Sequence, residues 1–176
     1  MSCLGRGRVR RLTIPAAHWP RARIICALLL VQAAAWPSQA AAKVRLSGLS
    51  DVNFGTIANL ETDSVQSQSV CLYSQSNRYS VRADGSGAGG AFVLSGGPSS
   101  LAYEVRWSAQ AGQTNGTGLS PGAVLSGLTT SAQNQNCSGS GPPTSASLIL
   151  VLPATALSAA MQGSYSGTLT LIVAEE

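Results

Sequence analysis

The chain has 176 residues, of which 44% are hydrophobic, 10% charged and 5% aromatic, and its formal net charge is +4. Six of the eleven Lys and Arg residues are arginines in the first 23 positions, whereas no acidic residue precedes Asp51. From Lys43 onward the formal net charge is −2, and the one histidine, His18, lies before that point. A body with this charge and no histidine argues against a nucleic-acid binder, a histidine-ligated metal site and a triad with histidine as its base.

The start of the chain has the order of a secretory signal peptide. An arginine-rich segment precedes the apolar stretch Ile24–Trp36, and small residues follow it. The apolar stretch has about 13 residues, fewer than the ~20 that a membrane-spanning helix needs. We therefore expect a signal peptide over residues 1–42, cleaved after about Ala40 or Ala42, and one exported domain over residues 43–176.

Beyond the signal peptide, hydrophobic residues recur with a period of two, which predicts half-buried antiparallel strands. In chain order, strands are expected at Val44–Leu49, Val52–Ile57, Val65–Tyr73, Arg78–Ala83, Ala91–Ser95, Leu101–Ser108, Ala146–Leu152 and Tyr165–Ala174. Glycine-rich turns separate several of them, and Gln110–Gly118 and Gln133–Asn136 are expected to be loops. Ala154–Met161 lies between a proline and a glycine and is expected to form at most two helical turns. Short strands with such turns predict an all-β sandwich.

Two cysteines, Cys71 and Cys137, remain after the predicted signal peptide is removed. In an exported protein they most simply form one disulfide. It closes a loop of about 66 residues, which is worth ~4 kcal/mol in the chain-entropy model. The alternative, a reactive thiol, lacks a nearby histidine or basic residue that would lower its pKa.

No motif in the body predicts catalysis, a bound cofactor or a metal. Gly85, Gly87 and Gly90 have the spacing of a dinucleotide fingerprint, but a strand follows them where that fingerprint needs a helix. Tyr103 and Trp107 share one strand face, where they could stack on a sugar, although burial in the core is the simpler interpretation. The acidic residues match no acid–base motif and are interpreted as solvated. We therefore expect a protein that is not an enzyme.

Several segments nevertheless form a specific pattern. They are VNFGTI at Val52–Ile57, SVCLYS, RYSVRADGSGAGGAFVLSGG, LAYEVRW, NQNCSGS and the closing LILVLPATALSAAMQGSYSGTLTLIVAEE. With them the chain resembles the spore coat protein U domain family, which includes the pilus subunits of the archaic (Csu-type) chaperone–usher system. The closing segment, with an alanine-rich turn, Gly163-x-Tyr165 and an alternating final strand, is the most diagnostic part.

The resemblance implies an immunoglobulin-like, pilin-type β-sandwich that is incomplete and lacks one strand. A periplasmic chaperone fills the gap first, and the N-terminal strand of a neighbouring subunit then replaces it. The implied function is that of a structural subunit of a fimbria, serving adhesion or biofilm formation. The implied partners are the chaperone, an outer-membrane usher and other pilus subunits. The implied location is the periplasm in transit and then the cell surface.

The same resemblance assigns two sets of site residues. The candidate donor residues are Val44, Leu46 and Leu49, and the candidate acceptor residues, on the strand that borders the groove, are Tyr165, Leu169, Leu171 and Val173. Gly48 interrupts the donor segment and Leu49 is out of phase with the other two residues. The segment is therefore expected to serve as the domain's own first strand or as a donor, since there is little room for both.

A second hypothesis is a complete, stand-alone secreted sandwich. Such a binding module would hold a carbohydrate or a surface partner through loops such as Gln110–Gly118.

Overall fold

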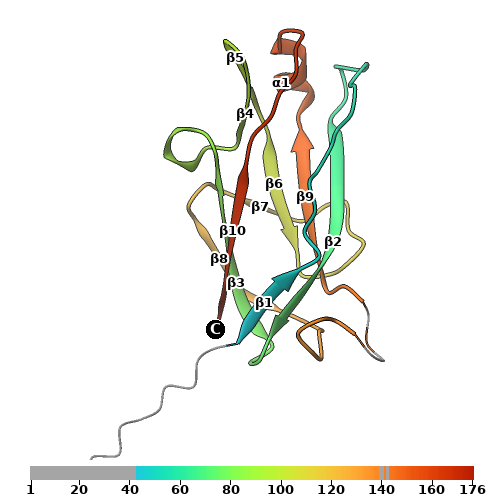
Figure 1. Cartoon of the computed structure of the whole chain (residues 1–176), viewed down its shortest axis with the longest axis vertical. Helices are drawn as coiled ribbons and strands as arrows, with labels where there is room; N and C mark the ends of the chain where they lie inside the picture. Colours follow the sequence, from blue (N-terminus) through green and yellow to red (C-terminus); the bar gives the residue numbers. More distant parts are fainter. Residues whose placement is uncertain (1–42, 139–140, 142) are drawn as a thin grey trace, which may run out of the picture. The chain divides into compact units, whose positions relative to one another are not determined.

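The computed structural model describes residues 43–138, 141 and 143–176, so the predicted signal peptide lies outside the described residues. As expected, nearly all of the regular structure is β (Figure 1). The elements are β1 (Val44–Ser47), β2 (Ser64–Ser74), β3 (Arg78–Gly85), the 3-10 turn Ala88–Gly90, β4 (Val93–Gly96), β5 (Ser99–Ala102), β6 (Glu104–Ser108), β7 (Thr117–Leu119), β8 (Val124–Thr129), β9 (Ala146–Leu152), α1 (Ala154–Ala159) and β10 (Leu169–Glu175).

The strands form two main antiparallel sheets and a hairpin. One sheet has the order β1-β2-β9-β6-β7, the other has the order β10-β3-β8, and β4 pairs with β5. Buried side chains from β2, β3, β6 and β9 belong to one hydrophobic cluster, so the two sheets pack face to face around a common core. The prediction of an all-β sandwich is confirmed.

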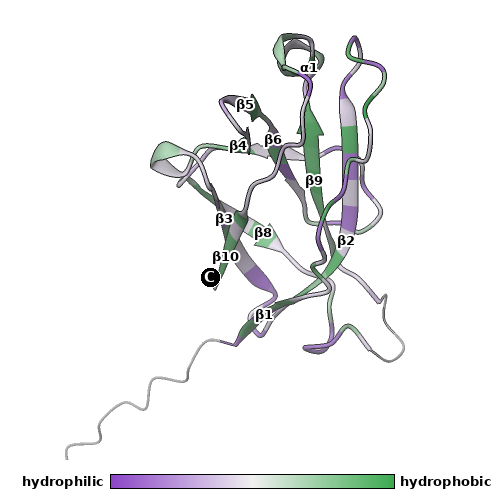
Figure 2. Ribbon diagram, turned by 45° about the horizontal axis from the view of Figure 1, so that its top comes forward, coloured by the Kyte–Doolittle hydropathy of each residue, from purple (hydrophilic) through white to green (hydrophobic). Residues whose placement is uncertain are grey.

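Strand β9 is the centre of the larger sheet, and all seven of its residues are buried (Figure 2). Its inner face contributes leucines to the core. Its outer face is covered by the chain that follows β6. Ser147 Oγ donates to the carbonyl of Gln110 (2.9 Å) and accepts from the amide of Gln113 (3.0 Å). The segment expected to be a binding loop is therefore packed on the sheet.

A buried hydrogen bond joins the two sheets. Trp107 Nε1 on β6 donates to the hydroxyl of Tyr79 on β3 over 2.9 Å, and the two rings meet edge to face. Trp107 is 1% exposed and Tyr79 is fully buried, so the core interpretation of Trp107 holds and a sugar could not stack on it. Burial raises the pKa of Tyr79, an effect that the bond from Trp107 partly offsets.

The predicted disulfide between Cys71 and Cys137 is present, with a Cα–Cα distance of 5.7 Å. It attaches β2 to the chain that follows β8, in a small cluster of its own with Ala132. Nearby, Ser145 Oγ donates to the carbonyl of Leu72 over 2.7 Å. The disulfide therefore fixes the connection between the two sheets at one end of the sandwich.

One predicted strand is wrong. Val52–Ile57 is not a strand, because it lies beside no strand edge with which it exchanges backbone hydrogen bonds. Its extended run is interrupted where Asn53 Oδ1 accepts from the amide of Gly55, a residue with φ of +65°. Val52 and Phe54, two residues apart, still turn toward the core, which explains the alternation that predicted a strand, and Ile57 joins them from a position out of phase.

Other strands differ in extent. Leu101–Ser108 is divided between β5 and β6, because the chain changes partners at Tyr103 and moves from the hairpin to the larger sheet. The last strand begins at Leu169, so Tyr165 lies outside it. Strands β7 and β8 were not predicted. In β8 a bulge near Gly127 puts the inward Leu125 and Leu128 three residues apart and hides the period of two.

We expect Tyr79→Phe to destabilise the domain by about 1–3 kcal/mol, because it leaves the buried indole N–H of Trp107 without an acceptor. Chemical denaturation monitored by tryptophan fluorescence measures the change. Tyr73→Phe is the matched control, since its hydroxyl bonds to no described residue and its removal should have little effect. Equal stability of the two variants would contradict this account of the core.

The disulfide should be complete in exported protein, so intact-mass analysis after alkylation should find no free thiol. Replacing Cys71 and Cys137 with alanine together should cost up to ~4 kcal/mol, because the bond closes a loop with a sequence separation of 66. Recovery of two alkylated cysteines from the exported protein would contradict the assignment.

Candidate functional site

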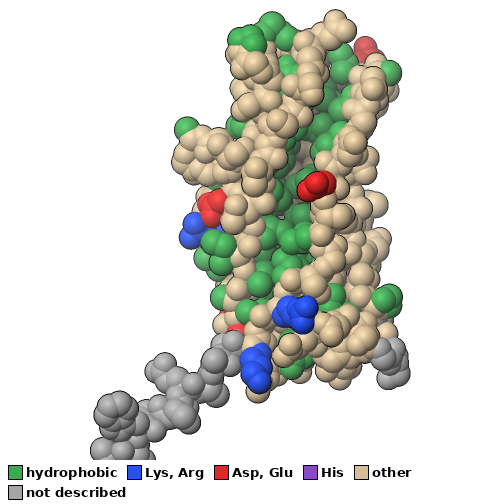
Figure 3. Space-filling model, viewed as in Figure 1, with side chains coloured by type: hydrophobic (Ala, Val, Ile, Leu, Met, Phe, Trp, Pro, Cys, Tyr) green, Lys and Arg blue, Asp and Glu red, His purple; other side chains and the backbone are tan. Residues whose placement is uncertain are grey.

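A long apolar cleft of about 1410 Å³ runs along the sandwich and opens to solvent (Figure 3). The inner leucines of β9, Leu101 of β5 and Tyr103, which lies between β5 and β6, form its floor. One wall is β10 with the segment before it, and the other is the segment between β1 and β2 (Figure 1). The floor residues include Leu101, Tyr103, Leu148, Leu150, Leu152 and Leu157. A gap of this kind lies where a further strand would close the sandwich.

The wall formed by β10 is a free strand edge. Glu176 N donates to the carbonyl of Arg78, which fixes the pairing between β10 and β3. Because hydrogen-bonded and non-hydrogen-bonded positions alternate along an antiparallel pair, the even-numbered residues of β10 bond to β3. The backbone groups of Leu169, Leu171 and Val173 therefore point away from β3, and they bond to none of the described residues.

The side chains of β10 follow the same alternation. The odd-numbered residues are half-buried and pack against the core, whereas Thr170, Ile172 and Ala174 are exposed on the outer face. The free backbone groups and the inward apolar side chains thus belong to the same residues. An added strand on this edge could form main-chain hydrogen bonds and bury its own side chains in the cleft at the same time.

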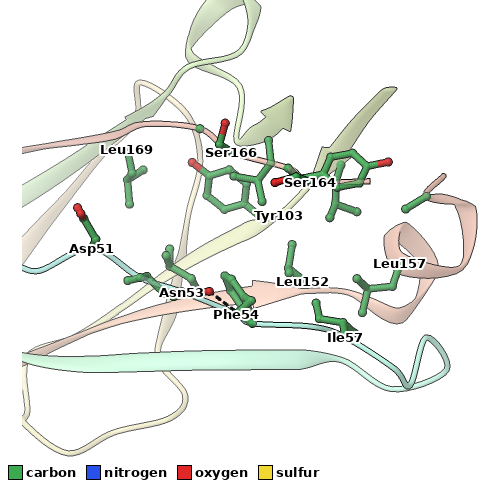
Figure 4. A pocket seen from close by; sticks show the side chains of 18 of the residues that line it. Asp51, Asn53, Phe54, Ile57, Tyr103, Leu152, Leu157, Ser164, Ser166 and Leu169 are labelled. Atoms are coloured by element: carbon green, nitrogen blue, oxygen red, sulfur yellow. Dashed lines mark hydrogen bonds between the residues drawn. The ribbon is translucent and has the colours of Figure 1, made fainter. Parts of the chain in front are cut away.

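The opposite wall, residues 48–63, forms no β-ladder with a neighbouring strand. Among the described residues, none makes a backbone–backbone hydrogen bond with this segment. Its attachment to β2 is the side chain of Gln68, whose amide oxygen accepts from the N–H of Ser50 (3.0 Å) and whose amide nitrogen donates to the carbonyl of Ser50 (3.2 Å). Val52, Phe54 and Ile57 complete the contact with apolar side chains (Figure 4).

The predicted acceptor residues gather at the cleft in part. Tyr165, Leu169 and Leu171 line it, whereas Val173 packs against the core beyond the lining. Tyr165 is positioned by its hydroxyl, which donates to the carbonyl of Met161 over 2.7 Å. The floor residues were expected to be core and were not recognised as part of a site. The signal in the sequence that could have revealed the floor was the recurrence of leucine at every second position of β9, which leaves that face of the strand without a polar residue.

The predicted donor residues are not free. Val44 and Leu46 lie in β1, which pairs with β2 in the register Val44↔Ser74 and Leu46↔Leu72. Gly48, with φ of +83°, ends that strand, and Leu49 is 46% exposed at the mouth of the cleft. The segment is the domain's own first strand, one of the two roles that the sequence left open. To act as a donor it would have to leave β2.

The cleft has little charge. Asp51 is the one charged residue among the described residues that line it, and it stands at the mouth. Burial raises the pKa of Tyr103, whose side chain reaches into the cleft from the floor. Within the described ranges no group of three His, Cys, Asp or Glu residues is placed to hold a metal ion. Nor does that part of the chain contain a helix long and apolar enough to span a membrane.

Comparisons with known proteins give little more than a general likeness. No family model matches the chain, and no curated protein matches it. A solved structure described as a chaperone–tip adhesin complex, vital for synergistic activation of CFA/I fimbriae biogenesis, is 15% identical to it with a TM-score of 0.48. The match covers 77% of this chain and 42% of that chain, so this chain spans less than half of that protein's length.

Amide hydrogen exchange can test the free edge. The amides of Leu169, Leu171 and Val173 should exchange faster than those of Thr170, Ile172 and Ala174 by roughly 100-fold or more, because the even-numbered amides bond to β3. NMR exchange measured residue by residue reads this alternation directly. Uniform protection along β10 would show that its outer edge is already paired.

Proposed function

We propose that the protein is a structural subunit of a chaperone–usher fimbria that receives a strand in the cleft. The observation that carries the proposal is the coincidence of a free strand edge with an apolar cleft about 1410 Å³ in volume. An unpaired edge beside a cleft with an apolar floor favours aggregation unless a partner covers it. A chaperone strand and then a strand of a neighbouring subunit would provide that cover in turn.

Two further features support this function. The segments that resemble the spore coat protein U family include both walls of the cleft, VNFGTI at Val52–Ile57 and the closing segment through Glu176. The lining has one charged residue and no arrangement typical of catalysis, so the proposal includes no enzymatic step. Export by the predicted signal peptide, the usher as a partner, and adhesion or biofilm formation complete the proposal.

The proposal can be tested by supplying the missing strand within one chain. Strand β10 ends at Glu175, so a tight turn placed after Glu176 would lead an added strand back along the free edge, antiparallel to β10. An added strand with alternating apolar residues should stabilise the domain by about 3 kcal/mol, which raises its melting temperature by about 10 °C. An added strand with serine at the inward positions is the control.

Two variants on adjacent residues localise the effect. Leu171→Glu places a charge in the cleft and should abolish the gain in melting temperature, whereas Ile172→Glu, on the exposed face of the same strand, should leave it unchanged. If the unextended domain is a stable monomer and the added strand gives no gain, the sandwich is complete and the stand-alone binding module is the better hypothesis.

A further inference from the structure

Tyr103 lies between β5 and β6 on the floor of the cleft, and its environment is apolar. It is 8% exposed, and its ring packs against Phe92 with 5.6 Å between the ring centroids. Figure 4 shows its side chain in the cleft together with Leu152 and Leu169. The hydroxyl of Tyr103 is thus a polar group on an otherwise apolar floor.

The hydroxyl of Tyr103 has no hydrogen-bond partner among the described residues, although its neighbour in the cleft, Tyr165, donates to Met161. The hydroxyl still reaches solvent. In the described part of the chain, Ser99 Oγ is the one side-chain polar atom that is both fully enclosed and without a hydrogen-bond partner, so the unpartnered hydroxyl of Tyr103 is not fully enclosed. In the open cleft the hydroxyl can bond to water. A strand that fills the cleft expels this water, and an unpaired buried hydroxyl then costs about 1–3 kcal/mol.

An incoming strand can provide a partner for this hydroxyl only through a side chain. Backbone N–H and C=O groups in a strand point along the sheet toward neighbouring strands, not across to the facing sheet. Tyr103 approaches from the floor and spans much of the ~10 Å between packed sheets, so a short side chain reaches it. Threonine and serine carry a hydroxyl on Cβ, and threonine also keeps a methyl group for the apolar floor.

Resting on the proposed function, we infer that Tyr103 is a specificity-determining residue of the cleft. It selects a strand that carries threonine or serine at the one inward position above Tyr103 and apolar residues at the other inward positions. An alternation of apolar residues alone is therefore not the best ligand. The hydroxyl also sets the register, because a shift of the strand by two residues would bury it against a methyl group.

A threonine scan of synthetic peptides tests this inference. The probes are peptides of about 12 residues, a length that runs alongside residues 164–175 at ~3.3 Å per residue. Valine occupies the inward positions and lysine or serine the outward ones, and each valine in turn is replaced by threonine. Affinity for the mature domain is measured by fluorescence anisotropy. Because threonine and valine have nearly the same shape, the comparison isolates the hydroxyl.

One position should prefer threonine over valine by about 3- to 10-fold in Kd, the effect of one hydrogen bond. Tyr103→Phe should abolish this preference without lowering the melting temperature, because the hydroxyl it removes has no partner in the domain. Tyr73→Phe is the matched control and should retain the preference, since Tyr73 lies outside the cleft and its hydroxyl bonds to no described residue.

The outcomes separate the two proposals. If the peptides bind but no position prefers threonine, or if the preference survives in Tyr103→Phe, the inference about Tyr103 is wrong and the strand-accepting function stands. If no peptide binds at all, both are wrong.

Discussion

The free edge of β10 is the constraint on which the rest of the structure depends. Every backbone N–H and C=O that leaves water needs a partner, and β10 has partners on one side only. Its other side faces a cleft whose floor is the inner face of β9, so the unpaired hydrogen-bonding groups and the leucines that line the cleft occur at the same place. One added strand satisfies both.

The remainder of the sandwich explains how the domain can stay folded with this cleft open. The hydrogen bond between Trp107 and Tyr79 joins the two sheets away from the cleft, and the Cys71–Cys137 disulfide fixes the chain at one end. The segment of residues 48–63, in contrast, is attached through the side chain of Gln68, a hydrogen bond from the amide of Ala154 to Asp63, and a few apolar contacts. Stability is therefore unequal across the molecule, and the wall of the cleft belongs to its weaker part.

The free backbone groups of β10 and the hydroxyl of Tyr103 have different roles in the proposed strand recognition. The first concerns affinity, and the second concerns sequence specificity. In the proposed function, backbone hydrogen bonds to β10 would give affinity to any extended chain and would not depend on its sequence. Sequence specificity would come from the floor, where the leucines would accept any apolar side chain and the hydroxyl of Tyr103 would require one polar side chain. A single buried hydroxyl can discriminate because leaving it unpaired costs more than a small misfit among leucines.

The sequence by itself determined the all-β class, most strand positions, the disulfide and the identity of the last strand as one wall of the site. These features are local or depend on composition: a period of two marks a strand wherever it lies, and the two cysteines after the predicted signal peptide allow one pairing. The bulge in β8 and the short β7 escaped prediction, because their side chains do not alternate along the sequence.

Tertiary structure decided which strand edges are paired. Val52–Ile57 has the alternation of a strand but is not one, because no neighbouring edge offers it hydrogen bonds. Val44 and Leu46 could have been a donor or the first strand of the domain, and pairing with β2 made them the latter. The sequence allowed Tyr103 to be a core residue or part of a sugar-binding platform, and the structure places it on the floor of the cleft because no described strand covers it. Pairing joins residues far apart in the chain, so no local pattern records it.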